Sequence, residues 1–297
     1  MTTLSAVVAT RDRPALVADC LATLISQREP PPGFEIVVID DGSTTDIAAA
    51  VADVVDGAPV PTRVVRQAPS GLAVARNHGA DVASGELLAY IDDDALVDPG
   101  WAAALTRCHE RLGYDGYAGR ITLDLPAPAP RWLTVPHRRY LAELDLGTDD
   151  RELDASEPGP FGANCAVPRA VFDRVGGFRA DLGRTGTSLL SNEETDFFHR
   201  VRTDGGRIAY CGRATVVHRV APERLTVAWF RRRVRAQGTS DMLMALEHGA
   251  PPSRRRELVR ALRAGPILAK GIASGAGATG ARLWLEYCGG RLAARSR

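Results

Sequence analysis

Two groups of aspartates in the first third of the chain are the residues best suited to chemistry. The pair Asp40 and Asp41 and the triplet Asp92, Asp93 and Asp94 each directly follow an apolar run. Carboxylates gathered in one place repel one another unless a cation compensates, and hard divalent cations prefer oxygen ligands. One such cluster alone would be typical of turn and capping residues. Two of them favour a site for Mg²⁺ or Mn²⁺, which would also neutralise a diphosphate.

The elements that must position these carboxylates are predicted to be strands of a parallel sheet. Four apolar runs of strand length end near residues 10, 39, 65 and 91, and stretches with helical spacing separate them at residues 16–24, 47–55 and 72–82. Short continuous apolar runs between helices indicate a parallel sheet that is covered on both faces. Ligands of such sheets bind beyond the carboxyl ends of the strands, so both aspartate groups are expected in one crevice.

The pattern loosens after residue 115. Six prolines between residues 124 and 160 exclude long regular elements, so this segment is either a lid over a binding site or a plain connector. Regular patterns then predict a short helix that ends at Gly176, a helix over residues 192–203 and a hairpin formed by residues 207–211 and 214–218. Beyond Pro222 the chain is predicted to be helical, with breaks at residues 251–252, 265–266 and 271–280.

Composition indicates a globular protein. The 297 residues are 45% hydrophobic and 25% charged, which permits a core without a disulfide or a metal. The five cysteines are scattered without a CxxC motif, and their odd number favours reduced thiols and a cytoplasmic protein. The first residues do not have the pattern of a signal peptide, and no apolar run reaches the length of a membrane span.

The small net charge of +1 conceals a strong asymmetry. Residues 1–218 carry 21 Lys and Arg against 31 Asp and Glu, whereas residues 219–297 carry 16 against 5. The basic C-terminal quarter is either a solvated helix surface or a region that meets phosphates or anionic lipid head groups. In the second case the protein would be peripheral at the inner face of the membrane.

Several short motifs occur in a characteristic order. They lie at residues 9–14, 40–44, 71–77, 84–86, 91–94, 162–164, 176–178, 192–197 and 217–218. With this ordered set the chain resembles the family 2 glycosyltransferases over roughly residues 4–240. The resemblance implies the α/β GT-A fold, an open and mostly parallel central sheet flanked by helices, followed here by a helical C-terminal extension. It places the GT-A domain at residues 1–220, with a nucleotide-binding half at 1–115 and an acceptor and catalytic half at 116–220, and the basic helical region at 221–297.

The resemblance also implies roles for individual residues. Asp92, Asp93 and Asp94 stand at the DxD motif, where Asp93 would approach the ribose and Asp94 would hold the cation together with His218. Thr10, Arg11 and Asp41 would contact the base end of the nucleotide, with Arg76 nearby. The other residues expected to bind the donor are Arg13, Asn164 and Glu193. A basic residue among Arg224, Arg231, Arg232 and Arg233 would clamp the diphosphate.

The family usually carries Glu-Asp where this chain has Glu193-Glu194. The second acid of that pair is the catalytic base, so Glu194 is expected to take the proton of the acceptor hydroxyl, with Glu193 and Asp196 as neighbouring alternatives. A single in-line displacement of the diphosphate would invert the anomeric centre. Arg11 also departs from the family, because it replaces an aromatic residue that often lies against the base.

Other function classes fit the sequence less well. A haloacid-dehalogenase-type phosphatase needs two aspartates separated by one residue and followed by Gly-Thr, whereas Asp40 and Asp41 are adjacent. A sugar-1-phosphate nucleotidyltransferase would have a lysine in a Gly-rich N-terminal loop, but the first lysine is Lys270. A dinucleotide-binding oxidoreductase would have GxGxxG after the first strand. A non-catalytic sugar-nucleotide binder is the remaining alternative.

The expected partners follow from this reading. The donor is a UDP-, dTDP- or GDP-linked sugar, and the acceptor is a glycan, a lipid-linked molecule or a natural product. No nucleic-acid partner is expected, and peripheral contact with a membrane would involve the basic C-terminal region.

Overall fold

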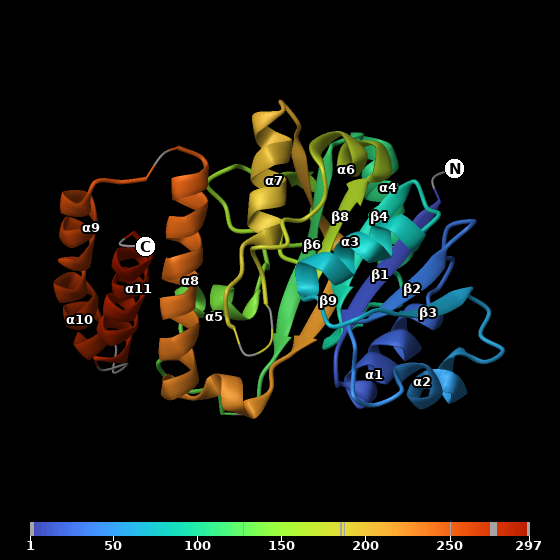
Figure 1. The fold of residues 1–297 in the computed structure, drawn as a ribbon, viewed down its shortest axis with the longest axis horizontal. Helices are drawn as coiled ribbons and strands as arrows, with labels where there is room; N and C mark the ends of the chain where they lie inside the picture. The colour runs from blue at the N-terminus through green and yellow to red at the C-terminus, as the bar shows by residue number, and fades with distance from the viewer. Residues whose placement is uncertain are drawn as a thin grey trace. The chain divides into compact units, whose positions relative to one another are not determined.

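The structure of the protein is a computed structural model that describes residues 3–126, 128–184, 186, 188–249, 251–273 and 278–295 (Figure 1). Its internal contacts group the chain into two units. The first unit comprises residues 1–124, 142–180 and 193–219, and the second comprises residues 125–141, 181–192 and 220–297. Two stretches that were expected in the catalytic half therefore group with the C-terminal helices.

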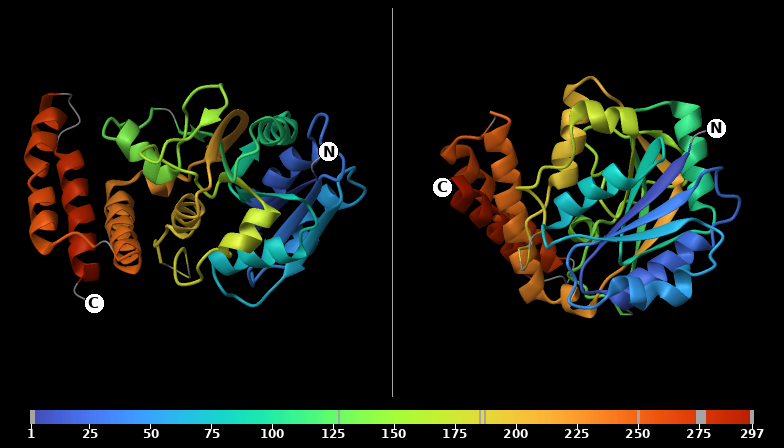
Figure 2. Two further views of the ribbon diagram at one scale, coloured as in Figure 1. Left: turned by 90° about the horizontal axis from the view of Figure 1, so that it is seen from above. Right: turned by 45° about the vertical axis from the view of Figure 1, so that its right-hand side comes forward.

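The first half of the central sheet is parallel. Strands β1 (Leu4–Thr10), β2 (Glu35–Asp40), β3 (Thr62–Arg66) and β4 (Leu87–Asp92) are ordered β3-β2-β1-β4 and connected by α1 (Pro14–Ile25), α2 (Ile47–Val55) and α3 (Leu72–Val82). Figure 2 shows helices on both faces of this sheet. Strands β1, β2 and β4 are almost entirely buried, which explains why they read as continuous apolar runs.

The second half of the sheet is mixed. Strand β8 (Asn164–Pro168) runs antiparallel to β4 and to β6 (Gly116–Asp124), whereas β9 (Ile208–Arg219) runs parallel to β6. Two short strands, β5 (Ala95–Val97) and β7 (Arg151–Glu152), pair antiparallel with β9. The flanking helices are α4 (Trp101–Leu112), α6 (Arg169–Val175) and α7 (Glu193–Thr203). The predicted α/β architecture is confirmed, and the parallel arrangement is confined mainly to the first half.

The predicted hairpin at residues 207–218 is wrong. Residues 208–219 form the single strand β9, and its pairing with β6 shifts register between Gly119 and Arg120, whose partners are Cys211 and Thr215. The extra residues form a bulge, which looks like a turn in the sequence because Gly212 interrupts the apolar pattern.

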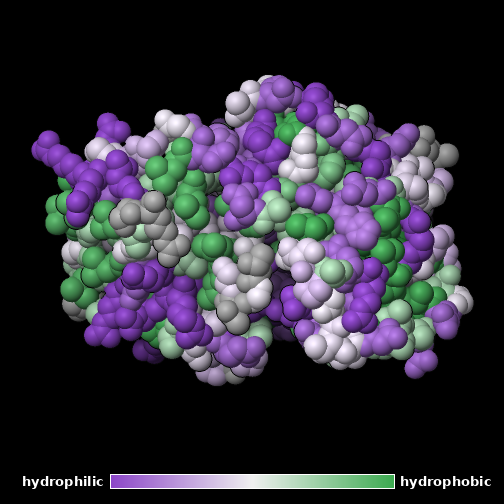
Figure 3. All heavy atoms as spheres, in the orientation of Figure 1, coloured by the Kyte–Doolittle hydropathy of each residue, from purple (hydrophilic) through white to green (hydrophobic). Residues whose placement is uncertain are grey.

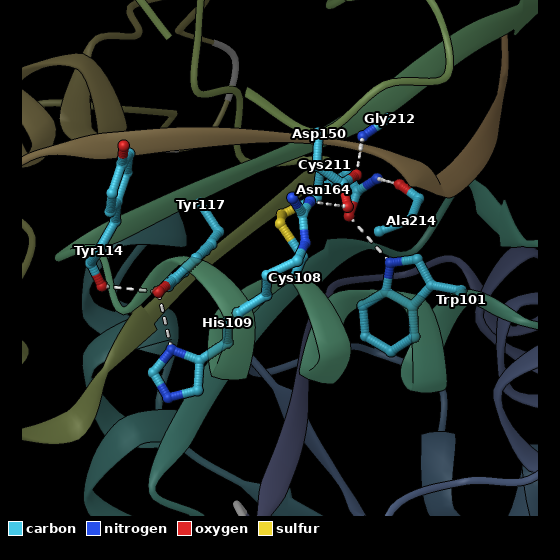
Figure 4. The surroundings of a disulfide bond; sticks show 11 residues. Trp101, Cys108, His109, Tyr114, Tyr117, Asp150, Asn164, Cys211, Gly212 and Ala214 are labelled. Carbon is cyan, nitrogen blue, oxygen red and sulfur yellow. Dashed lines mark hydrogen bonds and ion pairs between the residues drawn. A yellow bond between two sulfur atoms is a disulfide. The ribbon is translucent and has the colours of Figure 1, made fainter. Parts of the chain in front are cut away.

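The expectation that all five cysteines are reduced is also wrong. Cys108 of α4 and Cys211 of β9 form a disulfide across 103 residues of sequence, as Figure 4 shows. Cys20, Cys165 and Cys288 are buried free thiols. Helix α4 packs against β9, so the fold brings together two cysteines whose sequence spacing gives no hint of pairing. Because two of the cysteines form a disulfide, the cysteines no longer favour a cytoplasmic location.

The second unit is mainly helical. It contains α5 (Val135–Arg138), α8 (Val227–Glu247), α9 (Arg254–Ala261), α10 (Ala264–Ala273) and α11 (Thr279–Arg295), with 3₁₀ turns η1 (Arg139–Leu141) and η2 (Pro222–Leu225). Helices α8 and α11 approach closely through glycines: a Cβ atom on Gly238 would lie 2.1 Å from the carbonyl oxygen of Tyr287. No helix in the described parts of the chain has both the length and the apolar character that a membrane crossing requires.

Candidate active site

The carboxyl ends of β1 and β4 meet at Asp93. Its carboxylate accepts hydrogen bonds from Oγ1 of Thr10 at 2.7 Å and from Nη1 of Arg13 at 3.0 Å. Burial raises the pKa of Asp93 to about 6; Arg13 opposes this rise and Asp94 adds to it. Arg13 therefore supplies a positive counter-charge to the acid cluster, which lies where the sheet topology predicts.

Asp94 lies beside His218. Nε2 of His218 is 3.1 Å from Oδ1 of Asp94, and both side chains are buried. Strand pairing holds this geometry, because Ala95 of β5 is the register partner of His218 in β9. The backbone N–H of Arg219 also donates to the carbonyl oxygen of Asp94 at 2.9 Å. A carboxylate and an imidazole thus converge at the point where β4 turns into β5.

Asp41, at the end of β2, shapes the loop that leads into α3. Its Oδ1 accepts from the backbone N–H of Ser70 and from Nε2 of Gln67, both at 2.8 Å, and its Oδ2 accepts from the N–H of Gly71 at 2.9 Å. Gly71 has a φ of 96°, a conformation that favours glycine. The buried Asp41 carboxylate therefore fixes the start of the helix that carries Arg76.

Arg76 joins the acid cluster to the first turn of α7. Its Nη2 donates to Oδ1 of Asp92 at 2.8 Å, and its Nη1 donates to Oε1 of Glu193 at 2.7 Å. Burial alone would lower the pKa of this guanidinium, but Asp92 and Glu193 outweigh it and raise the pKa. A Cβ atom on Gly162 would lie 2.0 Å from Nη2 of Arg76, so the guanidinium fills space that only a glycine leaves open.

Glu194 follows directly in the first turn of α7. Its Oε2 is buried and has no hydrogen-bond partner among the described residues. Burial raises the pKa of Glu194 to about 8; Glu193 adds to the rise, and Arg76 opposes it. A carboxylate that takes up a proton near neutral pH is suited to general base chemistry. The neighbouring Asp196 is instead fully buried and accepts from Nε of Arg200 at 2.9 Å.

Comparison with known proteins identifies the family. The family model "Glycosyl transferase family 2" matches residues 5–176, which is more than half of the chain. This chain belongs to glycosyl transferase family 2.

The curated relatives of this glycosyltransferase include two that it matches over most of their length. It is 28% identical over 248 residues to the succinoglycan biosynthesis protein ExoM of Rhizobium meliloti, covering 80% of this chain and 74% of the relative. It is also 28% identical over 219 residues to the glucosyl-dolichyl phosphate glucuronosyltransferase of Haloferax volcanii, covering 72% of this chain and 68% of the relative.

Solved structures show that this glycosyltransferase has the GT-A fold. The mannosyltransferase PcManGT from Pyrobaculum calidifontis, in complex with GDP-Man and Mn²⁺, superposes with a TM-score of 0.61 and 20% identity over 99% of this chain and 75% of that one. GalNAc-T7 with UDP, GalNAc and Mn²⁺ superposes with a TM-score of 0.58 and 18% identity. That match covers 80% of this chain and 48% of GalNAc-T7.

Asn164 of the glycosyltransferase uses its side-chain amide for hydrogen bonds within the protein. Its Oδ1 accepts from Nε1 of Trp101 at 3.0 Å, and its Nδ2 donates to the carbonyl oxygens of Arg120 and Ala214 at 3.0 and 2.8 Å, as Figure 4 shows in part. A Cβ atom on Gly119 would lie 2.1 Å from Nδ2, which confirms how closely this amide is enclosed. The Asn164 side chain ties α4 to the sheet, and its part in donor binding stays a prediction.

Sequence reasoning missed the part played by Asp12. Its Oδ1 accepts from the backbone N–H and the Oγ1 of Thr44 at 2.6 and 2.7 Å, and its own N–H donates to Oγ of Ser43 at 2.8 Å. Asp12 has a φ of 54°, a rare conformation for a residue with a side chain. It thereby joins the loops after β1 and β2, while the neighbouring Arg11 is exposed and lies 3.8 Å from the Asp12 carboxylate.

The residues present fit a divalent cation that is shared with a diphosphate. Within the described residues, no three or more His, Cys, Asp and Glu side chains form a group that could hold a metal ion on their own. Mg²⁺ characteristically takes one or two protein ligands and completes its shell with substrate phosphates and waters. The buried pair of Asp94 and His218 offers one carboxylate oxygen, which suits Mg²⁺ and Mn²⁺, and one imidazole nitrogen.

Proposed function

We propose that the protein is an inverting, divalent-metal-dependent glycosyltransferase that moves a sugar from a nucleotide diphosphate donor to an acceptor hydroxyl. The observation that carries this proposal is the Arg76 bridge between Asp92 and Glu193. It joins the end of β4, where the aspartates gather, to the helical turn that carries Glu194. The bridge supports the proposal because the residue that it ties to the aspartates, Glu193, directly precedes the proposed base, Glu194.

Glu194 is the proposed catalytic base. Its carboxylate accepts the proton of the acceptor hydroxyl while the hydroxyl oxygen forms a bond to the anomeric carbon. The bond from that carbon to the diphosphate oxygen breaks, and its electron pair leaves with the nucleoside diphosphate. Because attack and departure occur on opposite faces, one displacement inverts the anomeric configuration. The raised pKa of Glu194 makes its carboxylate a stronger base than a solvated one.

Asp94 and His218 would hold the cation. When bound, Mg²⁺ or Mn²⁺ neutralises negative charge on the diphosphate leaving group. Arg13 contacts the same cluster, with Nη1 3.0 Å from Asp93 and 3.5 Å from Asp94. This arginine keeps the carboxylates together before a donor arrives. In the proposed complex Arg13 would contact the donor phosphates in place of these carboxylates.

The remaining residues of the proposed donor-binding set lie at or just after the ends of β1, β2 and β4, in α3 and at the start of α7. They are Thr10, Arg11, Arg13, Asp41, Arg76, Asp92, Asp93 and Glu193. We infer a nucleotide-sugar donor of the UDP, dTDP or GDP type, because the related structures are complexes with UDP and with GDP-Man.

The acceptor is proposed to be a glycan or a lipid-linked sugar. The two relatives matched over most of their length are named for succinoglycan biosynthesis and for a glucosyl-dolichyl phosphate substrate. A natural-product acceptor has weaker support, since the validoxylamine A glucosyltransferase of Streptomyces hygroscopicus subsp. limoneus matches only 36% of this chain.

A thermal-shift screen against UDP-, dTDP- and GDP-sugars tests the donor assignment. A ligand that binds only the folded protein raises the melting temperature, and at about 100 times its Kd the stabilisation is about 2.7 kcal/mol. The proposal predicts that one nucleotide class stabilises the protein more in the presence of Mn²⁺ than with EDTA. No stabilisation by any nucleotide sugar would contradict it. Stabilisation without turnover would favour the non-catalytic binder.

A further inference from the structure

Helices α9 and α10 present an exposed apolar strip in the second unit. The side chains of Leu258, Val259 and Leu262 are 54%, 56% and 74% exposed, and Leu268 of α10 is 36% exposed. Figure 3 shows green apolar side chains over the region of α9 and α10, bordered by purple polar ones. Isolated exposed leucines are ordinary on protein surfaces, but a group of neighbours is typical of an interaction site.

The strip is exposed because of the way α9 is rotated about its own axis. Leu262, the C-cap residue, keeps helical dihedral angles. At about 100° per residue, Leu258, Val259 and Leu262 therefore fall within roughly a third of the helix circumference. Glu257 lies outside this arc and is completely buried, where Arg291 of α11 donates to both of its oxygens at 2.8 and 3.0 Å. These two hydrogen bonds fix the rotation of α9 about its axis, so that Leu258, Val259 and Leu262 are exposed.

Exposed cations occur on the same two helices as the strip. Arg254, Arg255 and Arg256 in the first turn of α9, Arg263 after it and Lys270 in α10 are all exposed. The only acidic residue between positions 253 and 273 is Glu257, whose charge is buried and paired. Cations in the first turn of a helix oppose its dipole. Three arginines at that position therefore do not serve helix stability.

We propose that this basic and apolar face, made of Arg254, Arg255, Arg256, Leu258, Val259, Leu262, Arg263 and Lys270, binds the surface of a bilayer that contains anionic lipids. The exposed leucines and valine would enter the boundary between head groups and acyl chains, and the cations would meet the lipid phosphates. Arginine is common at protein interfaces as well, but the apolar residues of this face are Leu and Val, which are under-represented among interface hot spots, and it contains no Trp or Tyr, so a protein partner fits the composition less well. The proposal does not depend on the sugar-transfer chemistry.

Co-sedimentation with vesicles tests the proposal. The full chain should bind vesicles of phosphatidylcholine with phosphatidylglycerol, bind pure phosphatidylcholine far more weakly, and detach as NaCl is raised. The triple variant Arg254→Gln, Arg255→Gln, Arg256→Gln should lower the partition coefficient about tenfold or more. The triple variant Leu258→Ser, Val259→Ser, Leu262→Ser should lower it similarly. As a matched control, Arg28→Gln, Arg107→Gln, Arg213→Gln removes three exposed arginines of the first unit and should retain binding.

Several results would overturn the proposal. One is equal binding to both kinds of vesicle, and another is an equal loss of vesicle binding in the control variant. A third is concentration-dependent self-association of the native chain in analytical ultracentrifugation that the serine variant abolishes. If the triple variants fail to fold, as judged by circular dichroism, Leu262→Trp gives a second measurement. Its added fluorescence should be quenched by brominated lipids in anionic vesicles, and the absence of additional quenching relative to the native chain would also overturn the proposal.

Discussion

Nε2 of His218 lies 3.1 Å from Oδ1 of Asp94, although His218 is the next-to-last residue of β9 and Asp94 belongs to the turn between β4 and β5. The antiparallel pairing of β5 with β9 creates this proximity. Both side chains are buried; the carboxylate oxygen suits Mn²⁺, and the imidazole adds a nitrogen donor. This pair is the basis of the proposed cation site.

Removing either side chain of this pair should weaken cation binding. We expect Asp94→Asn and His218→Ala each to raise the Kd for Mn²⁺, measured by calorimetry in the presence of a nucleoside diphosphate, by about tenfold or more. Asp53→Asn removes an exposed carboxylate of α2 and should leave the Kd unchanged. An unchanged Kd in both site variants would contradict the assignment.

Glu194→Gln should abolish turnover while preserving the donor site. The amide has the same shape but cannot accept the proton, so the rate of nucleoside diphosphate release should fall about 10²–10⁴-fold. Donor affinity, measured by thermal shift, should stay close to that of the native protein. Glu194→Asp restores the acid usual in the family and should retain more activity than the glutamine variant. Undiminished turnover in Glu194→Gln would refute the role of this residue.

The raised pKa of Glu194 predicts a pH profile. The base must be ionised to accept a proton, and its pKa in the free protein is about 8. The value of kcat/KM should therefore rise with pH, by about tenfold per unit below pH 8, and level off above it. Measurement from pH 6 to pH 9 tests this. A flat profile across that range would show that the carboxylate titrates in its ordinary range.

Arg76 is expected to stabilise the fold as well as the site. Arg76→Gln leaves Asp92 and the buried Glu193 without their shared cation, and breaking such a buried pair costs about 3–5 kcal/mol. Urea unfolding should show this loss in the free energy of unfolding. Arg174→Gln removes an exposed arginine that is also paired with two aspartates and should have a much smaller effect. Equal losses in the two variants would contradict the buried bridge.

The disulfide makes a simple prediction about thiols. Protein purified without reductant and then denatured should react at three cysteines, Cys20, Cys165 and Cys288. Cys108→Ser releases Cys211, so the variant should react at all four of its remaining cysteines. Five reactive thiols in the native chain would show that the disulfide does not form.

Local patterns predicted much of the fold. Strands β1, β2 and β4 are buried on both faces and so give continuous apolar runs, and their ends could be read directly from Asp40 and Asp92. The contact of Asp93 with Thr10 follows from the neighbouring parallel strands.

Features that depend on tertiary contacts could not be predicted in the same way. The Arg76–Glu193 pair spans 117 residues and the Cys108–Cys211 disulfide spans 103, so no local period signals either one. The resemblance to the family drew attention to Asn164 but not to its hydrogen bonds with Trp101 and Ala214, which use its amide inside the protein. The bulge in β9 could not be distinguished from a hairpin turn, because a glycine such as Gly212 interrupts an apolar pattern in both cases.

The most direct test of the proposed function is the release of nucleoside diphosphate from a nucleotide sugar with Mn²⁺, with Mg²⁺ and with EDTA. The account predicts slow release that requires a divalent cation, is lost in Glu194→Gln and is strongly reduced in Asp94→Asn. Release of inorganic phosphate in the presence of EDTA, or cation-independent turnover that survives both substitutions, would contradict it.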